Sequence, residues 1–342
     1  IITVLMYYND KVNNIQGELT MAKDAIAVLT SGGDAPGMNA AVRAVVRSGI
    51  NKGFNVLGIK RGYRGLLKKD FVEMDLRSVT NIISLGGTIL YTARSKEFQT
   101  PEGIQHAAQN CMDMGVKGVV VIGGDGSFMG ARALSDAGVP CIGIPGTIDN
   151  DIACSDYTVG FDTAMNTAME MVDKIRDTSQ SHDRCSVVEV MGRRCGDIAL
   201  QTGISCGATA ILVPEVPYNI EQDVISRILE TRKNGKQHFI VVVAEGVGGS
   251  VDLAKYIERR TGIESRATIL GHVQRGGSPT LRDRVVASEM GYKAVELLAE
   301  GKSKRVVALK DGKIVDYDIT EALNMERVFD THLYEIAKTI SM

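Results

Sequence analysis

The chain has 342 residues, with 39 Lys and Arg against 41 Asp and Glu, so its formal net charge at pH 7 is −2. This balance excludes nucleic acid and anionic membranes as the main partner, because both attract strongly basic proteins. The length suffices for about two domains of ordinary size. The 37 glycines and the absence of tryptophan favour a fold with many tight turns between strands and helices.

Cysteine spacing and hydropathy indicate the cellular setting. The six cysteines form no C-x-x-C pair and no zinc-like spacing with the five histidines, so we expect reduced thiols. No apolar run reaches the roughly 18 residues that a membrane span needs, and we expect a cytoplasmic protein without a membrane partner. Residues 1–20 match nothing that follows, and we expect them to be a vector-derived or mis-annotated leader before Met21.

Apolar, β-branched runs recur along the chain, and each ends in glycine before a helical pattern begins. Because these runs are continuous rather than alternating, they predict parallel strands that helices cover on both faces. We therefore expect an α/β fold of doubly wound sheets, in two such units. The strand-and-helix units lie at residues 25–47, 118–138, 185–200 and 238–248, with further strands at 54–60 and 140–146.

Two turns with the sequence Gly-Gly-Asp follow predicted strands, at residues 32–34 and 123–125. Such a turn before a helix binds anions, because backbone N–H groups and the helix dipole converge there. The carboxylate of Asp125 is unexpected in this place. Neither turn spells the Walker or the dinucleotide motif. The alternative interpretation is a pair of tight turns in which Asp caps a helix.

The segment PGTIDND, residues 145–151, follows a predicted buried strand. Thr147, Asp149 and Asp151 alternate, so in an extended chain their side chains share one face. Two carboxylates this close are unfavourable unless a cation or a proton-accepting role accounts for them. The alternative is a surface turn with solvated charges.

Basic residues next to glycines or strand ends predict an anion pocket. Arginine binds phosphate in bidentate geometry, although a surface arginine is more often simply solvated. The segment GHVQRGGSP, residues 271–279, has too many glycines for a helix interior and is too short for a strand, so we expect it to shape the pocket. The candidates are Arg94, Arg184, Arg193, Arg266, His272 and Arg275.

These segments together resemble the bacterial ATP-dependent 6-phosphofructokinases, from about Lys23 to the C-terminus. Seven motifs occur in the family's order: LTSGGDAPGMNAAVR, GGTILYTAR, VIGGDGS, PGTIDNDI, GFDTA, EVMGR and LGHVQRGGSP. The resemblance implies two Rossmann-like, three-layer α/β domains with mainly parallel sheets, the second smaller, in a homotetramer. It implies a larger ATP-binding domain at 21–160 plus 273–324 and a smaller fructose 6-phosphate-binding domain at 161–272 plus 325–342.

The resemblance also implies roles for individual residues, with ATP and fructose 6-phosphate as substrates. Asp149 would be the base for the sugar's 1-hydroxyl, with Thr147, Arg193 and Arg94 beside the transferring phosphoryl group, and Asp125 would hold Mg²⁺. The ATP residues would be Gly33, Tyr63, Arg94, Ser95, Gly124, Asp125, Gly126 and Ser127. The sugar-phosphate residues would be Thr147, Ile148, Asp149, Met191, Gly192, Arg193, Glu245, His272, Val273, Gln274 and Arg275, with Arg184 and Arg266 from a neighbouring subunit.

Two glycines bear on the phosphoryl donor. The family's pyrophosphate-using branch carries Asp where this chain has Gly126 and Lys where it has Gly146. An Asp at 126 would intrude on the nucleotide's α-phosphate, and a Lys at 146 would add charge for a bare diphosphate. The two glycines therefore favour ATP, with pyrophosphate as the alternative donor.

The family's effector site, for ADP or phosphoenolpyruvate, is only partly retained. Matching positions are Arg43, Arg47, Arg176, Gly207, Lys236 and His238, whereas Leu76, Thr209, Asn234 and Gln237 depart from the pattern. Losing three cations and the glutamate that meets the effector's magnesium predicts blunted or altered allostery. A catalytically silent sugar-phosphate sensor is the other alternative, and it is disfavoured because Asp149 and Asp125 are both present.

Overall fold

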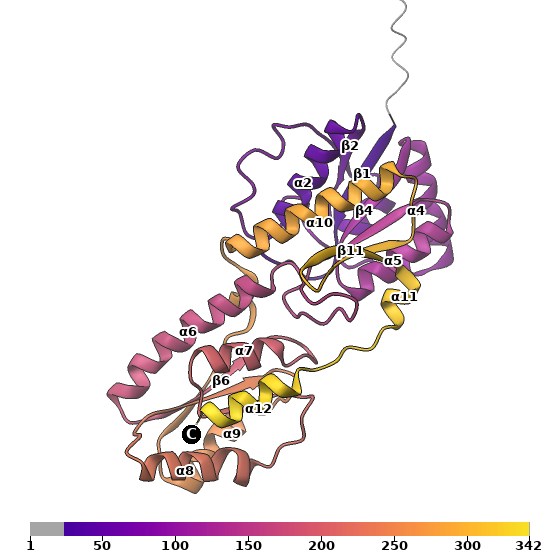
Figure 1. Ribbon diagram of the computed structural model, residues 1–342. Helices are drawn as coiled ribbons and strands as arrows, with labels where there is room; N and C mark the ends of the chain where they lie inside the picture. Colours follow the sequence, from indigo (N-terminus) through magenta and orange to yellow (C-terminus); the bar gives the residue numbers. More distant parts are fainter. Residues whose placement is uncertain (1–23, 342) are drawn as a thin grey trace, which may run out of the picture.

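The structure is a computed structural model that describes residues 24–341, so the expectation of a leader at residues 1–20 lies outside the described residues. It has two lobes joined by a long helix, α6 (Phe161–Ser181) (Figure 1). No helix among residues 24–341 is both long and apolar enough to cross a membrane. All six cysteines are buried and free.

The larger lobe is built on a seven-stranded sheet of order β11-β10-β5-β4-β1-β2-β3, in which only the edge strands β3 and β11 are antiparallel. Its strands are β1 (Ala25–Thr30), β2 (Asn55–Ile59), β3 (Phe71–Met74), β4 (Val116–Gly123), β5 (Cys141–Pro145), β10 (Arg305–Lys310) and β11 (Lys313–Asp318). Its helices are α2 (Met38–Asn51), α3 (Gly62–Leu67), η1 (Glu97–Gln99), α4 (Pro101–Asp113), α5 (Asp125–Asp136), α10 (Leu281–Ala299) and α11 (Ile319–Asn324).

The smaller lobe has a parallel four-stranded sheet of order β7-β8-β6-β9. Its strands are β6 (Cys185–Val190), β7 (Ala210–Leu212), β8 (Phe239–Ala244) and β9 (Ser265–Ile269). Its remaining helical elements are α7 (Asp197–Ser205), η2 (Glu221–Ile225), α8 (Ser226–Lys233), α9 (Ser250–Thr261), η3 (Gly271–Arg275) and α12 (Thr331–Ile340).

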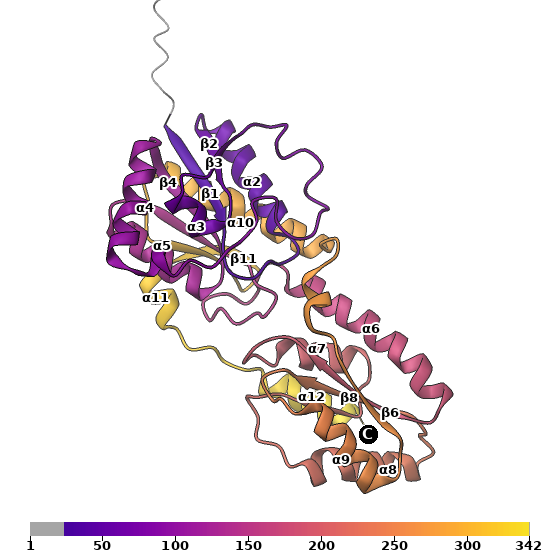
Figure 2. The same ribbon diagram turned by 180° about the vertical axis from the view of Figure 1, so that it is seen from behind.

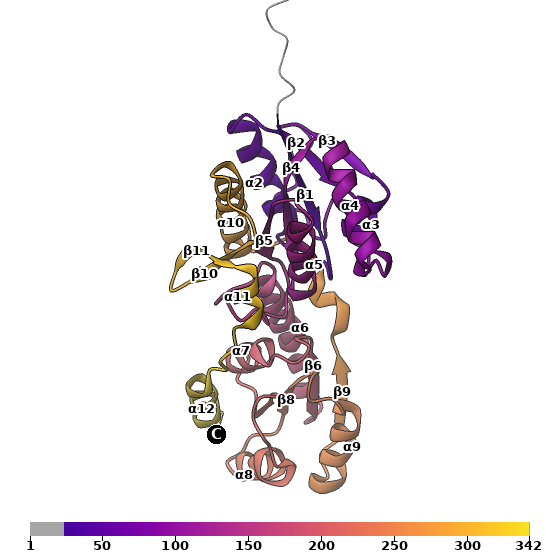
Figure 3. The same cartoon turned by 90° about the vertical axis from the view of Figure 1, so that its right-hand side faces the viewer.

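Helices cover both faces of both sheets, as the continuous apolar strands predict. In β1 the side chains of Ile26 and Val28 pack toward α2 and α10, whereas Ala27 and Leu29 pack toward α3, α4 and α5. Figure 3 shows these two helical layers on opposite sides of the larger sheet. In the smaller lobe, α6, α7 and α12 cover one face and α8 and α9 the other. The predicted three-layer α/β fold, with the second sheet smaller, is confirmed.

The chain passes between the lobes three times, before α6, between η3 and α10, and between α11 and α12 (Figure 2). At the first passage a fully buried carboxylate, that of Asp283 on α10, ties down the start of α6. It accepts hydrogen bonds from the Tyr157 hydroxyl (2.5 Å), the Gly160 N–H (2.7 Å) and the Thr163 N–H (2.9 Å) and hydroxyl (2.5 Å). This one side chain therefore fixes where the smaller lobe leaves the larger one.

Replacing Asp283 by alanine should lower the stability of the fold strongly. The substitution leaves several buried donors without an acceptor, which costs about 3 kcal/mol or more and lowers the thermal midpoint by about 6 °C or more. Thermal unfolding followed by circular dichroism measures the effect. Asp113→Ala, which removes a surface pair with Lys69, is the control and should change stability by about 0.5 kcal/mol or less. Equal midpoints for the two variants would contradict this role.

Candidate active site

A cavity of about 860 Å³ opens at the carboxyl ends of β1, β4 and β5. The turns that follow these three strands line it, together with the loop that carries Arg94 and, from the smaller lobe, the segments that carry Arg193 and Arg275. In open parallel sheets, ligands bind at this edge. The cavity brings together Gly33, Tyr63, Arg94, Ser95, Gly124, Asp125, Gly126, Ser127, Thr147, Asp149, Arg193 and Arg275 from the predicted site, with Asp151 beside them.

The turn after β4 presents the N-terminus of α5 to this cavity. Gly124 is the N-cap, and Asp125 is the first helical residue. Tyr63, stacked on Phe98 at a ring-centroid distance of 4.0 Å, donates a hydrogen bond to the Ser127 carbonyl at 2.6 Å. The backbone N–H groups of a helix's first turn bind anions. Because α5 is capped by Gly124 and α2 by Gly37, the alternative in which Asp caps both helices is wrong.

The turn after β1 lies directly against Arg275 from the end of η3. The Arg275 guanidinium donates a hydrogen bond to the Asp34 carbonyl at 3.0 Å. A Cβ atom at Gly33 would lie 2.5 Å from Nη1 of Arg275, so a larger residue would displace the guanidinium from this position. A cation of the smaller lobe therefore rests on a backbone turn of the larger one.

The turn after β5 carries Thr147, Asp149 and Asp151, but the expectation of an extended chain there is wrong. Ile148 and Asp149 form a turn, and Asn150 has a positive φ of 52°. The Asp149 N–H donates to the Thr147 hydroxyl at 3.2 Å. This tight turn, rather than strand alternation, brings the three side chains to the same cavity.

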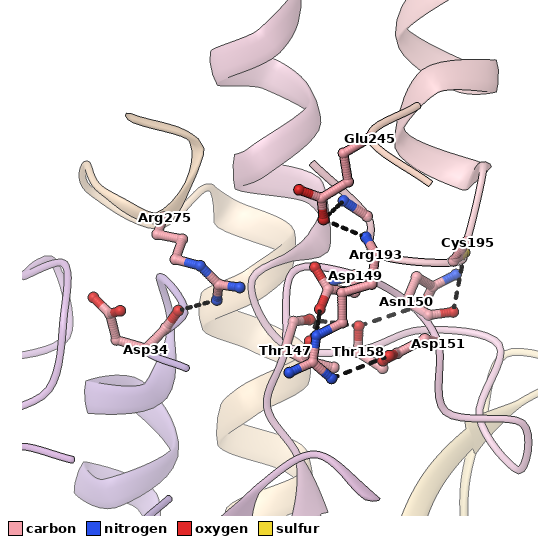
Figure 4. A network of polar contacts seen from close by, with 11 residues as sticks. Asp34, Thr147, Asp149, Asn150, Asp151, Thr158, Arg193, Cys195, Glu245 and Arg275 are labelled. Atoms are coloured by element: carbon pink, nitrogen blue, oxygen red, sulfur yellow. Dashed lines mark hydrogen bonds and ion pairs between the residues drawn. The ribbon is translucent and has the colours of Figure 1, made fainter. Parts of the chain in front are cut away.

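Asp149 is the most buried carboxylate lining the cavity. It is 1% exposed, and its Oδ1 has no hydrogen-bond partner. Its Oδ2 lies 3.4 Å from Nε of Arg193, whose Nη1 is 3.8 Å from Oδ2 of Asp151 (Figure 4). Burial, and then the charge of Asp151, raise the pKa of Asp149, while Arg275 and Arg193 oppose this shift. The surface-turn alternative for residues 145–151 is therefore wrong.

Asp125 faces the same crowding. Burial, with a further contribution from Asp151, raises the pKa of Asp125 to about 6, and Arg193 acts in the opposite direction. A divalent cation between Asp125 and a bound phosphate would relieve this repulsion. Magnesium binds through one or two carboxylates plus substrate phosphates, so the oxygen donors here fit Mg²⁺. Within residues 24–341 there is no cluster of three or more metal-ligating side chains that would form an all-protein metal site.

The smaller lobe contributes residues that follow the ends of its own strands. Glu245, after β8, accepts hydrogen bonds from the N–H groups of Gly192 (3.2 Å) and Arg193 (2.5 Å). Gln274 of η3 is buried and accepts from the Met191 N–H at 2.8 Å. These contacts fix the loop after β6 that carries Arg193. The segment at residues 271–279, which the sequence predicts to be neither a helix interior nor a strand, begins with the short 3-10 helix η3.

Several of the predicted sugar-phosphate residues do not line the cavity. His272 and Val273 are exposed on η3, whereas the side chain of Ile148 is fully buried and does not line the cavity. Arg184 and Arg266 lie at the starts of β6 and β9, the opposite end from Met191, and both pair with Glu264 at 2.8 Å. One chain therefore does not bring these two arginines to its own Asp149.

The predicted effector residues form two groups in one chain. Lys236 donates to the Thr209 hydroxyl at 3.1 Å, and Arg176 donates to the Cys206 carbonyl beside Gly207. Burial, Arg176 and Lys236 lower the pKa of His238. The second group, Arg43 and Arg47, lies on α2 of the larger lobe, and Leu76 is 47% exposed.

Sequence reasoning left several contributors without a role. Lys96 and Phe98 line the cavity next to Arg94 and Ser95. Arg327 contacts the turn after β5 from a segment 177 residues away in sequence. Neither a motif nor a periodicity marks these residues, and only the folded chain brings them to the site.

The fold and the site define a two-lobed α/β protein in which the N-terminus of α5 faces a cavity lined by the buried carboxylate of Asp149 and by Asp125 and Asp151. A family model described as Phosphofructokinase matches residues 25–298. The chain is 60% identical over 316 residues to the ATP-dependent 6-phosphofructokinase of Clostridium botulinum, covering 92% of this chain and 99% of that protein. The identity to the enzyme of the same name from Clostridium tetani is 61%, over the same shares. The chain belongs to the phosphofructokinase family.

Solved structures agree with the fold. Phosphofructokinase from Saccharomyces cerevisiae superposes with a TM-score of 0.82 at 36% identity, covering 93% of this chain and 47% of the yeast chain. A pyrophosphate-dependent phosphofructokinase from Marinobacter aquaeolei has a TM-score of 0.79 at 23% identity, covering 90% of this chain and 86% of the other. The second likeness concerns the fold alone.

Proposed function

We propose that this protein phosphorylates fructose 6-phosphate at its 1-hydroxyl with ATP, giving fructose 1,6-bisphosphate and ADP, a step of glycolysis. The observation that carries the proposal is Asp149, a buried carboxylate with an unpartnered oxygen, in the cavity that the N-terminus of α5 also lines. The 60% identical relatives named ATP-dependent 6-phosphofructokinase support the same activity.

The reaction needs a base, charge neutralisation and in-line positioning. The sugar's 1-hydroxyl oxygen bonds to the γ-phosphorus while the bond from that phosphorus to the β,γ-bridging oxygen breaks. Asp149 accepts the hydroxyl proton, and ADP leaves. Arg193 and Arg94 stabilise charge on the transferring phosphoryl group, and the Thr147 hydroxyl orients it. Asp125 would hold Mg²⁺, which would neutralise phosphate charge when bound.

We assign ATP to the larger lobe. The N–H groups of Asp125 and Gly126 face its phosphates, with Ser127 in the same turn, and Gly33 lies in the turn after β1, against Arg275. Tyr63 and Ser95 line the same cavity. The division into an ATP-binding domain, 21–160 plus 273–324, and a sugar-phosphate domain, 161–272 plus 325–342, is supported by which sheet most of each segment packs on, except that η3, which ends at Arg275, lies with the smaller lobe.

We assign the sugar phosphate to the smaller lobe. Met191, Gly192 and Glu245 lie beside Arg193 and line the sugar, with Ile148 contributing backbone. The segment His272–Arg275 faces the 6-phosphate. Arg184 and Arg266 of a neighbouring copy complete the site in a homotetramer, which the position of both arginines at the far end of their own sheet supports.

The choice of phosphoryl donor depends on the space beside Gly126 and Gly146. The surroundings of these two glycines differ. A Cβ atom at Gly126 would meet nothing within 4 Å, so the room for a nucleotide phosphate lies there. A Cβ atom at Gly146 would lie 2.9 Å from the Ile122 side chain, against the core. Gly126 is thus the position at which a side chain would compete with ATP.

Allostery through ADP or phosphoenolpyruvate is altered in this proposal. Lys236 and Arg176 supply positive charge, but Thr209, which is buried and binds Lys236, offers no carboxylate to an effector's magnesium. Asn234 and Gln237 add no charge. Each charge-assisted contact that is lost removes about 1.5 to 3 kcal/mol of effector binding.

Replacing the base tests its role. Asp149→Ser should lower kcat by about 10² to 10⁴-fold, because proton removal from the hydroxyl loses its acceptor, while both KM values change little. Steady-state kinetics with aldolase-coupled detection measures this. Asp156→Ser is the matched control, since Asp156 lies in the following loop and pairs with Lys310 instead. Turnover close to that of the natural protein in Asp149→Ser would refute the assignment.

The phosphoryl donor tests the proposed function itself. The protein should turn over faster with ATP than with pyrophosphate, and Gly126→Asp should weaken use of ATP because its carboxylate enters the open space. Gly126→Ala, which adds one methyl group, is the control. Faster turnover with pyrophosphate would mean that the protein belongs to the pyrophosphate-using branch of the family. No turnover with either donor would favour the catalytically silent sugar-phosphate sensor.

Effector response tests the altered site. The fructose 6-phosphate saturation curve should shift little on addition of ADP or phosphoenolpyruvate. Thr209→Glu should increase the response to ADP with magnesium, because it adds the missing carboxylate. Strong sigmoidicity that micromolar ADP relieves in the natural protein would disprove this proposal.

A further inference from the structure

Arg327 lies on the segment that returns from α11 of the larger lobe to α12 of the smaller one, drawn in yellow in Figure 1. It lies beyond residues 25–298, which the family model matches. Its side chain is only 22% exposed, which is unusual for a guanidinium outside a site.

The guanidinium of Arg327 makes contacts on both sides of the cleft. Its Nε donates to the backbone carbonyl of Asn150 at 3.1 Å, in the turn after β5. Its Nη2 pairs with Asp197, the first residue of α7, and its Nη1 lies 3.3 Å from Oε1 of Glu215. The amide of Asn150 closes the network by donating to Asp197 at 2.9 Å.

This network holds Asn150, the residue between two carboxylates of the cavity. Asn150 separates Asp149 from Asp151, and its left-handed conformation, with φ at 52°, turns both carboxylates into the cavity. A non-glycine residue in that conformation needs contacts that hold it. The carbonyl of Asn150 accepts a hydrogen bond from Arg327, and its side-chain amide donates to Asp197, so both ends of the residue are held.

Asp197, at the start of α7, directly follows the loop that carries Arg193. That loop is fixed at one end by Glu245, which binds the Arg193 N–H, and at the other by Asp197, which binds Arg327. Arg193 in turn lies 3.4 Å from the carboxylate of Asp149. Arg327 therefore links the loop of the cation to the turn of the base.

We propose that Arg327 is a positioning residue that holds the Asn150 turn and the Arg193 loop in register across the cleft. It contacts no substrate in this proposal and acts through Asn150 and Asp197. The kinetic part of the inference rests on the proposed function, whereas the structural part concerns the order of the turn and stands independently.

Hydrogen exchange and kinetics on the full-length protein test the proposal together. In Arg327→Gln, amide exchange in peptides that cover residues 147–151 should become faster. The kcat should fall by about ten- to a hundredfold with little change in either KM, because misplacing a catalytic group by about 1 Å costs this much in rate. Arg327→Lys should recover part of the loss, since lysine keeps the charge but reaches fewer acceptors. The double variant with Asp197→Asn should lose no more than the larger single loss.

The matched control is Arg305→Gln. Arg305 is likewise partly buried and pairs with a carboxylate and a backbone carbonyl, both of Asp316, but in the β10–β11 hairpin. It should leave both kcat and exchange at residues 147–151 unchanged. Unchanged exchange in Arg327→Gln, or an equal loss of kcat in Arg305→Gln, would overturn the proposal. If the natural protein does not phosphorylate fructose 6-phosphate, the proposed function fails, and the exchange measurement still decides whether Arg327 holds the turn.

Discussion

The crowding of three carboxylates at one sheet edge is the constraint on which this site depends. Asp125, Asp149 and Asp151 face a single cavity, and burial, followed by the charge of Asp151, raises the pKa values of the first two. Such an arrangement persists only where cations or bound metal compensate it. The larger lobe supplies the negative charge and the anion-binding turns, and the compensating arginines come from the smaller lobe. Arg193 and Arg275 of the smaller lobe therefore face the carboxylates of the larger lobe across the cleft.

The backbone carries much of this arrangement. Anion binding at the first turn of α5 needs free N–H groups, and no side chain caps those of Asp125 and Gly126, whereas the Ser127 N–H already donates to the Gly124 carbonyl at 2.8 Å. A Cβ atom at Gly33 would displace the Arg275 guanidinium from its position against the turn after β1. The loop of Arg193 is held through its own N–H groups by Glu245. Preorganised groups of this kind need little rearrangement when a ligand binds.

Sequence reasoning predicted the features that have local causes. Continuous apolar runs such as that of β1 predicted both sheets, and glycine-rich turns after strands predicted which residues line the cavity. The shape of the turn at Asn150 was missed, because alternation along the chain cannot reveal a positive φ. Asp283 and Arg327 received no role, since their partners lie more than a hundred residues away. Contacts between residues so far apart in sequence arise from the tertiary fold and produce no periodic pattern in the sequence.

The three passages of the chain between the lobes also govern how the molecule comes apart. Neither lobe is a continuous stretch of sequence, because the larger one resumes at α10 and the smaller one resumes at α12. A single proteolytic cut in any one connection would leave two covalent links, so the lobes would stay associated at high effective concentration. For the same reason, an early folding intermediate with only the N-terminal strands in place lacks β10 and β11 at one sheet edge. Completion of the larger lobe has to wait for synthesis of nearly the whole chain.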